Sequence, residues 1–191
     1  LTDINDIPRL DRVWREFFPK NPPARTIMPV QCIVVPDGRI EITLVALKRD
    51  GRTKKEVINT SRAPAPLFHE SQAVRAGDIL FLSALLAADE RGIVPAARRN
   101  PHYPYGANRA GAQMEAIMQN AQAICEAAGT DLRHALRLTT MHMDLSEYAH
   151  AIGARRTCFP DGQPATTTLQ VGGPLQVPEC SIAVDLWVGY P

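Results

Sequence analysis

The sequence predicts an α+β fold in which two helices cover one face of a mixed sheet. In two stretches, residues 109–128 and 145–158, apolar residues recur at helical spacing. Short apolar or alternating runs precede, separate and follow these stretches, as expected for strands. From residue 56 onward the elements therefore run strand, strand, strand, helix, strand, helix, strand, strand.

The N-terminal part predicts one more helix and two more strands. Residues 3–18 have helical spacing, with Asp3 or Asn5 as a cap and Pro8 confined to the first turn. Pro19 ends this helix. Residues 25–35 and 39–47 are predicted strands on either side of the turn Pro36-Asp37-Gly38, and we expect them to form a hairpin.

A charged linker over residues 48–55 divides the chain into a unit at 1–50 and a unit at 56–191. The second unit begins with strands near 56–60, 72–74 and 79–86. A long loop over 89–106 leads to the first helix, which ends at Gly129. A strand at 136–143 precedes the second helix. We expect the last two strands, 166–171 and 181–188, to form a hairpin.

The two units share residues at a constant separation of 141 positions, which indicates an internal duplication. The matched pairs are Asp3 with Asp144, Phe18 with Phe159, Pro19 with Pro160, Pro23 with Pro164, Ala24 with Ala165 and Val30 with Val171. Residues 1–50 then correspond to the C-terminal part of a first repeat. We expect its earlier part, roughly 85 residues for domains of equal size, to be cleaved, absent or supplied by another chain. A half-repeat with open strand edges is not expected to be stable alone.

Composition argues against several classes of function. A net charge of +1 gives no electrostatic basis for nucleic-acid binding. No apolar run approaches the roughly 20 residues of a membrane span, and no signal peptide is visible, so we expect a cytoplasmic protein. The four cysteines show no CxxC spacing and predict neither a zinc site nor a disulfide framework. A basic, aromatic loop from Arg98 to Tyr105 could bind RNA or close over a cleft.

Several motifs taken together resemble the RidA/YjgF family of imine and enamine deaminases, also described as endoribonuclease L-PSP. The residues that carry the resemblance are Pro23-Ala24-Arg25 with 39–42, Ala63-Pro64-Ala65 with Ser83, 126–132 and 144–148. The resemblance implies a chorismate-mutase-like fold and trimers whose sheets form a central barrel, with ligand clefts between neighbouring subunits. It also implies hydrolysis of reactive imino acids to keto acids and ammonia, with no metal or organic cofactor.

The family pattern places an arginine after Pro-Ala and an acid on the final strand. An arginine fork can grip the carboxylate of an imino acid, and a nearby carboxylate can transfer protons. Here the first unit has Arg25 but Thr43 at the acid position, with Glu41 two residues earlier. The second unit has Asp185 at the acid position but Thr166 in place of the arginine. Neither unit therefore holds the full pair.

The candidate catalytic residues are Arg25, Glu41 and Asp185, and the candidate substrate-binding residues are Arg25, Ser83, Glu70 and Tyr105. Glu70 aligns with a tyrosine of the family.

The predicted function is hydrolytic deamination of 2-imino or enamine acids, and the expected ligand is a small carboxylate-bearing metabolite. One alternative is a catalytically degenerate protein of the same fold that binds a small carboxylate or acts as a scaffold. A weaker alternative is a chorismatase-like hydrolase. The expected assembly is a homo-oligomer, trimeric or pseudo-hexameric, or a complex with a second chain that supplies the rest of the first repeat.

Overall fold

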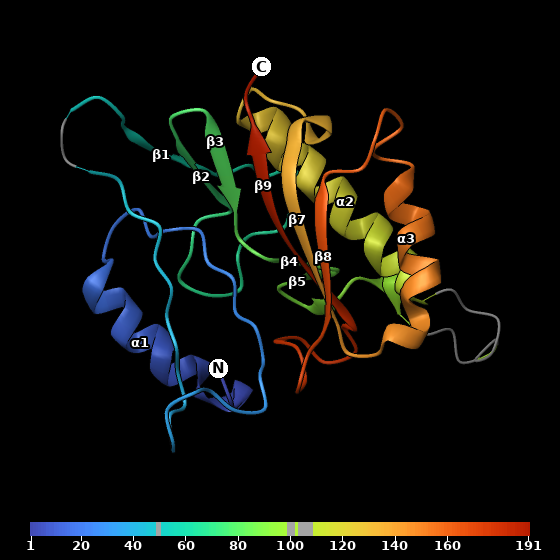
Figure 1. The fold of residues 1–191 in the computed structure, drawn as a ribbon, viewed down its shortest axis with the longest axis horizontal. Coiled ribbons are helices and arrows are strands. Elements are labelled where there is room, and N and C mark those ends of the chain that lie inside the picture. The colour runs from blue at the N-terminus through green and yellow to red at the C-terminus, as the bar shows by residue number, and fades with distance from the viewer. Residues whose placement is uncertain (49–50, 99–101, 103–108) are drawn as a thin grey trace.

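The computed structural model describes residues 1–48, 51–98, 102 and 109–191. Its centre is a mixed sheet with the strand order β1-β2-β3-β9-β7-β8 (Figure 1). The strands are β1 (Lys55–Ile58), β2 (Ala73–Ala76), β3 (Ile79–Leu82), β7 (Ala135–His142), β8 (Ala165–Gln170) and β9 (Ile182–Gly189). The short β4 (Leu85–Leu86) also pairs with β9. Neighbouring strands are antiparallel, except that β8 runs parallel to β7.

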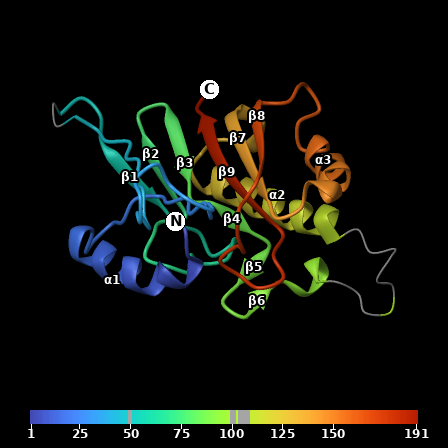
Figure 2. The ribbon, with the colours of Figure 1, turned by 60° about the horizontal axis from the view of Figure 1, so that its bottom comes forward.

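Two helices, α2 (Arg109–Ala127) and α3 (Tyr148–Arg156), lie on one face of this sheet (Figures 1 and 2). The apolar positions predicted for α2 are all buried: Met114, Ile117, Met118, Ala121 and Ile124. Gly129 follows the helix with a φ of 79°, a left-handed conformation that suits glycine at a helix end. The α+β class and the two helices on one face are thus present in the structure.

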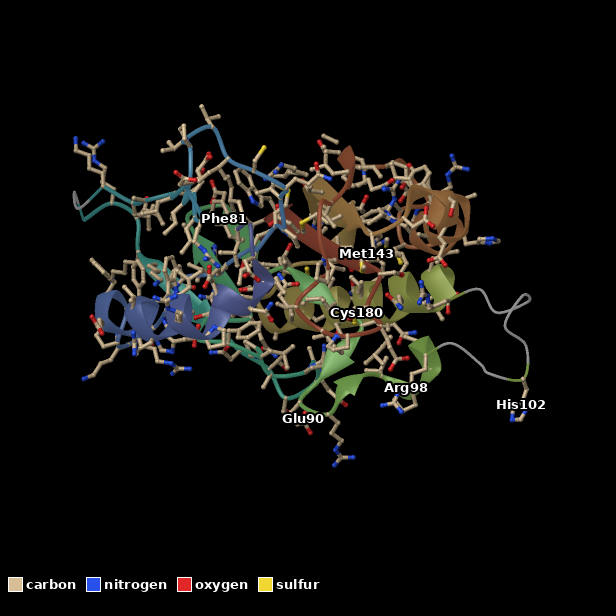
Figure 3. All side chains as sticks on the ribbon, turned by 90° about the horizontal axis from the view of Figure 1, so that it is seen from below. Phe81, Glu90, Arg98, His102, Met143 and Cys180 are labelled. Atoms are coloured by element: carbon tan, nitrogen blue, oxygen red, sulfur yellow. The ribbon has the colours of Figure 1, made fainter. Side chains whose placement is uncertain are left out.

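Shorter elements complete the fold. β5 (Ala88–Asp89) and β6 (Gly92–Ile93) form a two-stranded sheet within the long loop, and one 3₁₀ turn follows at Pro95–Ala97. Another 3₁₀ turn, Leu132–His134, precedes β7. Arg98 and His102 lie on the side of the molecule opposite the N-terminal helix (Figure 3).

Two predictions about the second unit need correction. β8 and β9 do not form a hairpin, because β7 lies between them and pairs with both. The predicted strand at 79–86 is interrupted at Ser83 and Ala84. The backbone N–H of Ala84 there donates to the carbonyl of Arg25 (3.1 Å), so the chain turns to meet the N-terminal segment before β4 begins.

The N-terminal helix is present as a 3₁₀ turn, Ile4–Asp6, followed by α1 (Ile7–Phe17), which lies apart from α2 and α3 (Figure 2). The hairpin expected over residues 25–47 is wrong. No helix or strand is assigned in this segment, and a turn lies at Pro36 and Asp37. A strand needs a neighbour for its backbone groups. In the last sheet positions of the domain, β7 lies between β8 and β9 and pairs with both. At the corresponding place between residues 25–30 and 39–47, the described chain supplies backbone hydrogen bonds only from Leu1 and Thr2.

No helix among the described residues is long and apolar enough to cross a membrane.

Candidate functional site

Arg25 connects the N-terminal segment to the domain. It follows the proline-rich turn after α1, and only 9% of its surface is exposed. Its backbone N–H donates to Oγ of Ser83 (2.9 Å), and the Ser83 hydroxyl in turn donates to the carbonyl of Ser71 (2.6 Å). Ser83, at the interruption of the third strand, and Ser71, in the loop before β2, thereby fix the position of Arg25.

Two carboxylates hold the guanidinium of Arg25. Its Nε donates to Oε2 of Glu70 and its Nη2 donates to Oδ1 of Asp11, each at 2.9 Å. The rings of Trp14 and Phe68 flank it at 5.5 and 5.8 Å from centroid to Cζ, within cation–π range. The remaining nitrogen, Nη1, is buried and has no hydrogen-bond partner among the described residues. One nitrogen of the guanidinium therefore keeps hydrogen-bonding capacity that the described residues do not use.

The two carboxyl groups titrate in opposite directions. Burial raises the pKa of Glu70, and the charge of Arg25 only partly offsets this. Burial also acts to raise the pKa of Asp11, but the N–H of His69 and the guanidinium of Arg25 outweigh it, so that pKa is lowered. Asp11 is thus the permanent counterion of Arg25, and Glu70 is the carboxyl that takes up a proton more readily.

The loop that carries Glu70 is fastened to α1. The backbone N–H of His69 donates to Asp11 (3.0 Å). Nδ1 of His69 faces Nη1 of Arg15 at 3.1 Å, and Nε2 lies 2.6 Å from the carbonyl oxygen of Phe18. Because a guanidinium only donates, Nδ1 accepts and Nε2–H donates to the carbonyl. α1, Arg25 and this loop therefore form one connected unit.

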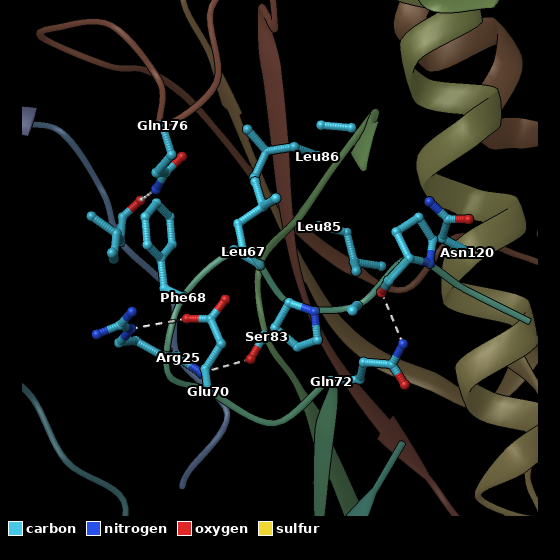
Figure 4. Close-up of a pocket in the computed structure, with 16 residues that line it drawn as sticks. Arg25, Leu67, Phe68, Glu70, Gln72, Ser83, Leu85, Leu86, Asn120 and Gln176 are labelled. Carbon is cyan, nitrogen blue, oxygen red and sulfur yellow. Dashed lines mark hydrogen bonds and ion pairs between the residues drawn. The ribbon is translucent and has the colours of Figure 1, made fainter. Parts of the chain in front are cut away.

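A cleft with about 610 Å³ of empty space, part of it open to solvent, borders Arg25, Glu70 and Ser83 (Figure 4). Ile27, Leu67, Phe68, Leu85 and Leu86 supply apolar walls, and Asn120 of α2 lies across the cleft from Arg25. Gln176 also lines the cleft. Its Nε2 donates to the carbonyl of Ile27 (2.7 Å), while its buried Oε1 has no partner in the described residues. Small apolar groups and a few polar atoms fit such a site.

Residues 60–185 match the family model described as Endoribonuclease L-PSP. The chain belongs to this family, the RidA/L-PSP family. Reactive Intermediate Deaminase A, chloroplastic, of Arabidopsis thaliana is 31% identical over 118 residues, which are 62% of this chain and 58% of that protein. RutC family protein y4sK of Sinorhizobium fredii is 33% identical over 116 residues, which are 61% of this chain and 84% of that protein. The chain therefore spans little more than half of the Arabidopsis relative.

Solved structures of the RidA/L-PSP family share the fold. RidA from an Antarctic Psychrobacter species superposes with a TM-score of 0.58 at 25% sequence identity. The superposed region covers 70% of this chain and 98% of the Psychrobacter chain. YyfA of the Rid protein family, from Yersinia pestis, gives a TM-score of 0.60 at 19% identity and covers 71% and 99%. The family model begins at residue 60, so Arg25 lies outside the matched region.

The structure brings together some of the residues predicted from sequence. Arg25, Glu70 and Ser83 line one cleft. The Ser83 hydroxyl is occupied by two backbone groups, so it shapes the cleft. Arg25 and Ser83 come from two distant segments of one chain. The clefts between subunits that the family resemblance implied stay a prediction. Tyr105 lies outside the described residues.

The other two predicted catalytic residues lie elsewhere. Glu41 is exposed and makes no hydrogen bond or ion pair with the described residues. Asp185 on β9 is buried, accepts a hydrogen bond from the Thr26 hydroxyl (2.9 Å) and pairs with Arg137 (3.4 Å). It does not line the cleft beside Arg25.

Asp185 gives a testable pH dependence. Burial raises its pKa above the ordinary 3.8, despite the Thr26 hydrogen bond and the charge of Arg137. The folded state therefore holds this proton to higher pH than the unfolded state, and the resulting stability is lost as pH rises above about 3.8. In Asp185→Asn this loss is absent. We expect the free energy of unfolding of the variant, measured in urea from pH 3.5 to 7, to increase relative to that of the native chain as pH rises. Parallel curves would contradict this assignment.

Sequence reasoning missed Asp11, Trp14 and Gln176. Asp11 lies among charged residues on the predicted polar face of α1, and nothing local shows that Arg25, fourteen positions later, folds back onto it. The i,i+4 spacing of Asp11 and Arg15 predicts the ion pair between them, but it does not predict the contact of Asp11 with Arg25. Gln176 lies in a loop whose course depends on the strand order.

Proposed function

We propose that this chain hydrolyses a small imine or enamine that bears a carboxylate, yielding a keto acid and ammonia. The observation that carries the proposal is the buried Arg25, which lines an apolar cleft beside Glu70 and keeps Nη1 without a partner among the described residues. Membership of a family that includes a Reactive Intermediate Deaminase A supports it.

The proposed roles follow from the charges. Nη1 of Arg25 binds the carboxylate of the ligand, which fixes the imine carbon in the apolar part of the cleft. Glu70 accepts a proton from the attacking water, and the water oxygen bonds to the imine carbon. Glu70 then returns that proton to the nitrogen, which gives a carbinolamine. Glu70 next takes the hydroxyl proton of the carbinolamine and passes it to the amino nitrogen, so the C–N bond breaks, ammonia leaves and the carbonyl forms. The raised pKa of Glu70 suits a group that must both take and give a proton.

The test is ammonia release from freshly generated 2-iminopropanoate and from bulkier imino acids. Arg25→Lys keeps the positive charge but loses the planar fork, so at least a tenfold lower kcat/KM is expected, in line with about 1.4 kcal/mol of lost ligand contact. Arg62→Lys is the matched control, because Arg62 is an exposed arginine paired with Glu126 and does not line the cleft. No acceleration by the native chain on any imine would overturn the proposal.

A second candidate function is binding of a small carboxylate without turnover. The observation that favours it is the occupation of Nε and Nη2 of Arg25 by Glu70 and Asp11, which leaves a ligand only one edge of the guanidinium. Calorimetric binding of pyruvate, lost in Arg25→Lys and unaccompanied by turnover of imines, would establish this alternative.

A further inference from the structure

Gln176 brings a loop between β8 and β9 to the cleft beside Arg25. Its neighbours Leu175 and Val177 are buried in the core, so the loop is held firmly on both sides of Gln176. Figure 4 shows Gln176 and Arg25 at one end of the cleft, on either side of Phe68. A residue of the second unit therefore completes the end of the cleft at which the proposed function places the ligand carboxylate.

The hydrogen bond of Gln176 fixes which end of its amide is available. One amide atom lies 2.7 Å from the carbonyl oxygen of Ile27. Because a carbonyl oxygen only accepts hydrogen bonds, that atom is Nε2 and the other is Oε1. Ile27 follows Arg25 by two residues, which places their Cα atoms at most about 7 Å apart. The amide is thus anchored to the segment that carries Arg25, and Oε1 is its unused end.

Two buried polar atoms of the cleft residues have no hydrogen-bond partner among the described residues, Nη1 of Arg25 and Oε1 of Gln176. The other buried polar side chains of the lining, Gln72 and Ser83, are occupied by backbone groups. Buried polar groups are normally paired, so the two unused atoms require an explanation. One is a donor and the other an acceptor. A single ligand that carries both an acceptor and a donor can therefore satisfy them.

We propose that Oε1 of Gln176 accepts a hydrogen bond from the nitrogen of the ligand and makes the cleft selective for carboxylates with an N–H on the adjacent carbon. This rests on the proposed function, in which Nη1 of Arg25 binds the carboxylate. In 2-imino and enamine acids the adjacent carbon carries an N–H, whereas in the keto acid it carries an oxygen without hydrogen. The keto acid leaves Oε1 unpaired, so the site holds the nitrogen-bearing substrate more tightly than its product.

Oxamate and pyruvate are a matched pair of probes. Oxamate carries an amino group on the carbon next to the carboxylate, as the enamine 2-aminoacrylate does, and pyruvate carries a methyl group there. In calorimetry, the native chain should bind oxamate at least about tenfold more tightly than pyruvate. In Gln176→Met, which keeps the length of the side chain without an acceptor oxygen, the ratio should fall to near one. Gln119→Met is the control and should keep the native ratio, because Gln119 is an exposed residue of α2 outside the cleft lining.

Gln176→Glu separates the acceptor from the bond to Ile27. This variant keeps a side-chain acceptor but has no donor for the Ile27 carbonyl. Its negative charge should weaken the binding of both probes, while the preference for oxamate should remain. The proposal is overturned by any of four results: no binding of oxamate, a native ratio near one, the native ratio retained in Gln176→Met, or the same loss of preference in Gln176→Glu.

Ammonia release from imino acids, measured on the same samples, tests the proposed function separately. A native chain that prefers oxamate through Gln176 but does not accelerate imine hydrolysis would support this inference for binding and overturn the deaminase function. A native chain that hydrolyses imines but binds the two probes equally would overturn this inference and leave the function standing.

Discussion

Replacing Arg25 with alanine is expected to lower the free energy of unfolding by about 3–5 kcal/mol. The substitution leaves the carboxylates of Asp11 and Glu70 buried near each other without their shared cation. The packing of the guanidinium between Trp14 and Phe68 is lost as well. Urea denaturation at pH 7, compared with Arg62→Ala, measures the effect. Because Arg62 is an exposed partner of Glu126, its loss should cost no more than about 1 kcal/mol.

The same variant should recover part of its stability at lower pH. Without Arg25, the group that protonates most readily is Glu70, whose pKa burial already raises in the native chain. Folding then favours the protonated carboxyl, so the deficit relative to the native chain should shrink as pH falls from 7 toward 5. A deficit that is constant with pH, or equal to that of Arg62→Ala, would show that Arg25 is not the counterion of a buried pair.

Replacing Glu70 with glutamine is expected to reduce imine hydrolysis by about 10²–10⁴-fold, the range for loss of a general acid–base group. Glutamine retains the size of glutamate and an acceptor for Nε of Arg25, so the cleft should keep its shape. The native rate should fall as pH drops through the raised pKa of Glu70, because the protonated carboxyl cannot accept a proton from water. The variant should lack this dependence.

Glu90→Gln is the matched control for that experiment, since Glu90 is an exposed glutamate outside the cleft lining. A Glu70→Gln variant that keeps both the native rate and the native pH profile would remove Glu70 from the mechanism while leaving Arg25 as a binding residue. Asp185→Asn should retain turnover, since Asp185 pairs with Thr26 and Arg137 away from the cleft lining.

Periodicity predicted the parts of the fold in which local sequence decides the outcome. The apolar spacing of α2 and the cap at Asp3 depend only on neighbouring residues, and both are present. The strand order could not be obtained in this way, because the insertion of β7 between β8 and β9 depends on how a loop crosses the sheet. The segment 25–47 shows the same limit, since its alternating pattern predicts a strand but does not supply a neighbour.

The cleft was predictable only through the family resemblance, which pointed to Arg25, Ser83 and Glu70. The electrostatic setting of Arg25 was not predictable, because Asp11 approaches it from a helix whose orientation depends on tertiary packing. The candidate acids on the last strands, Glu41 and Asp185, followed a family alignment that this chain does not satisfy. Glu70, chosen as a binding residue, is the carboxyl that the structure places beside the arginine.

The interruption of the third strand at Ser83 makes the cleft a junction between distant parts of the chain. The lining of the cleft is complete only when the segment that bears Arg25 is packed against residues 64–88. Ligand binding in the cleft and packing of that segment are therefore thermodynamically linked. A ligand that bridges both walls would favour the docked form by about 2.7 kcal/mol at a hundred times its dissociation constant. We therefore expect the N-terminal segment to resist proteolysis better when the cleft is occupied.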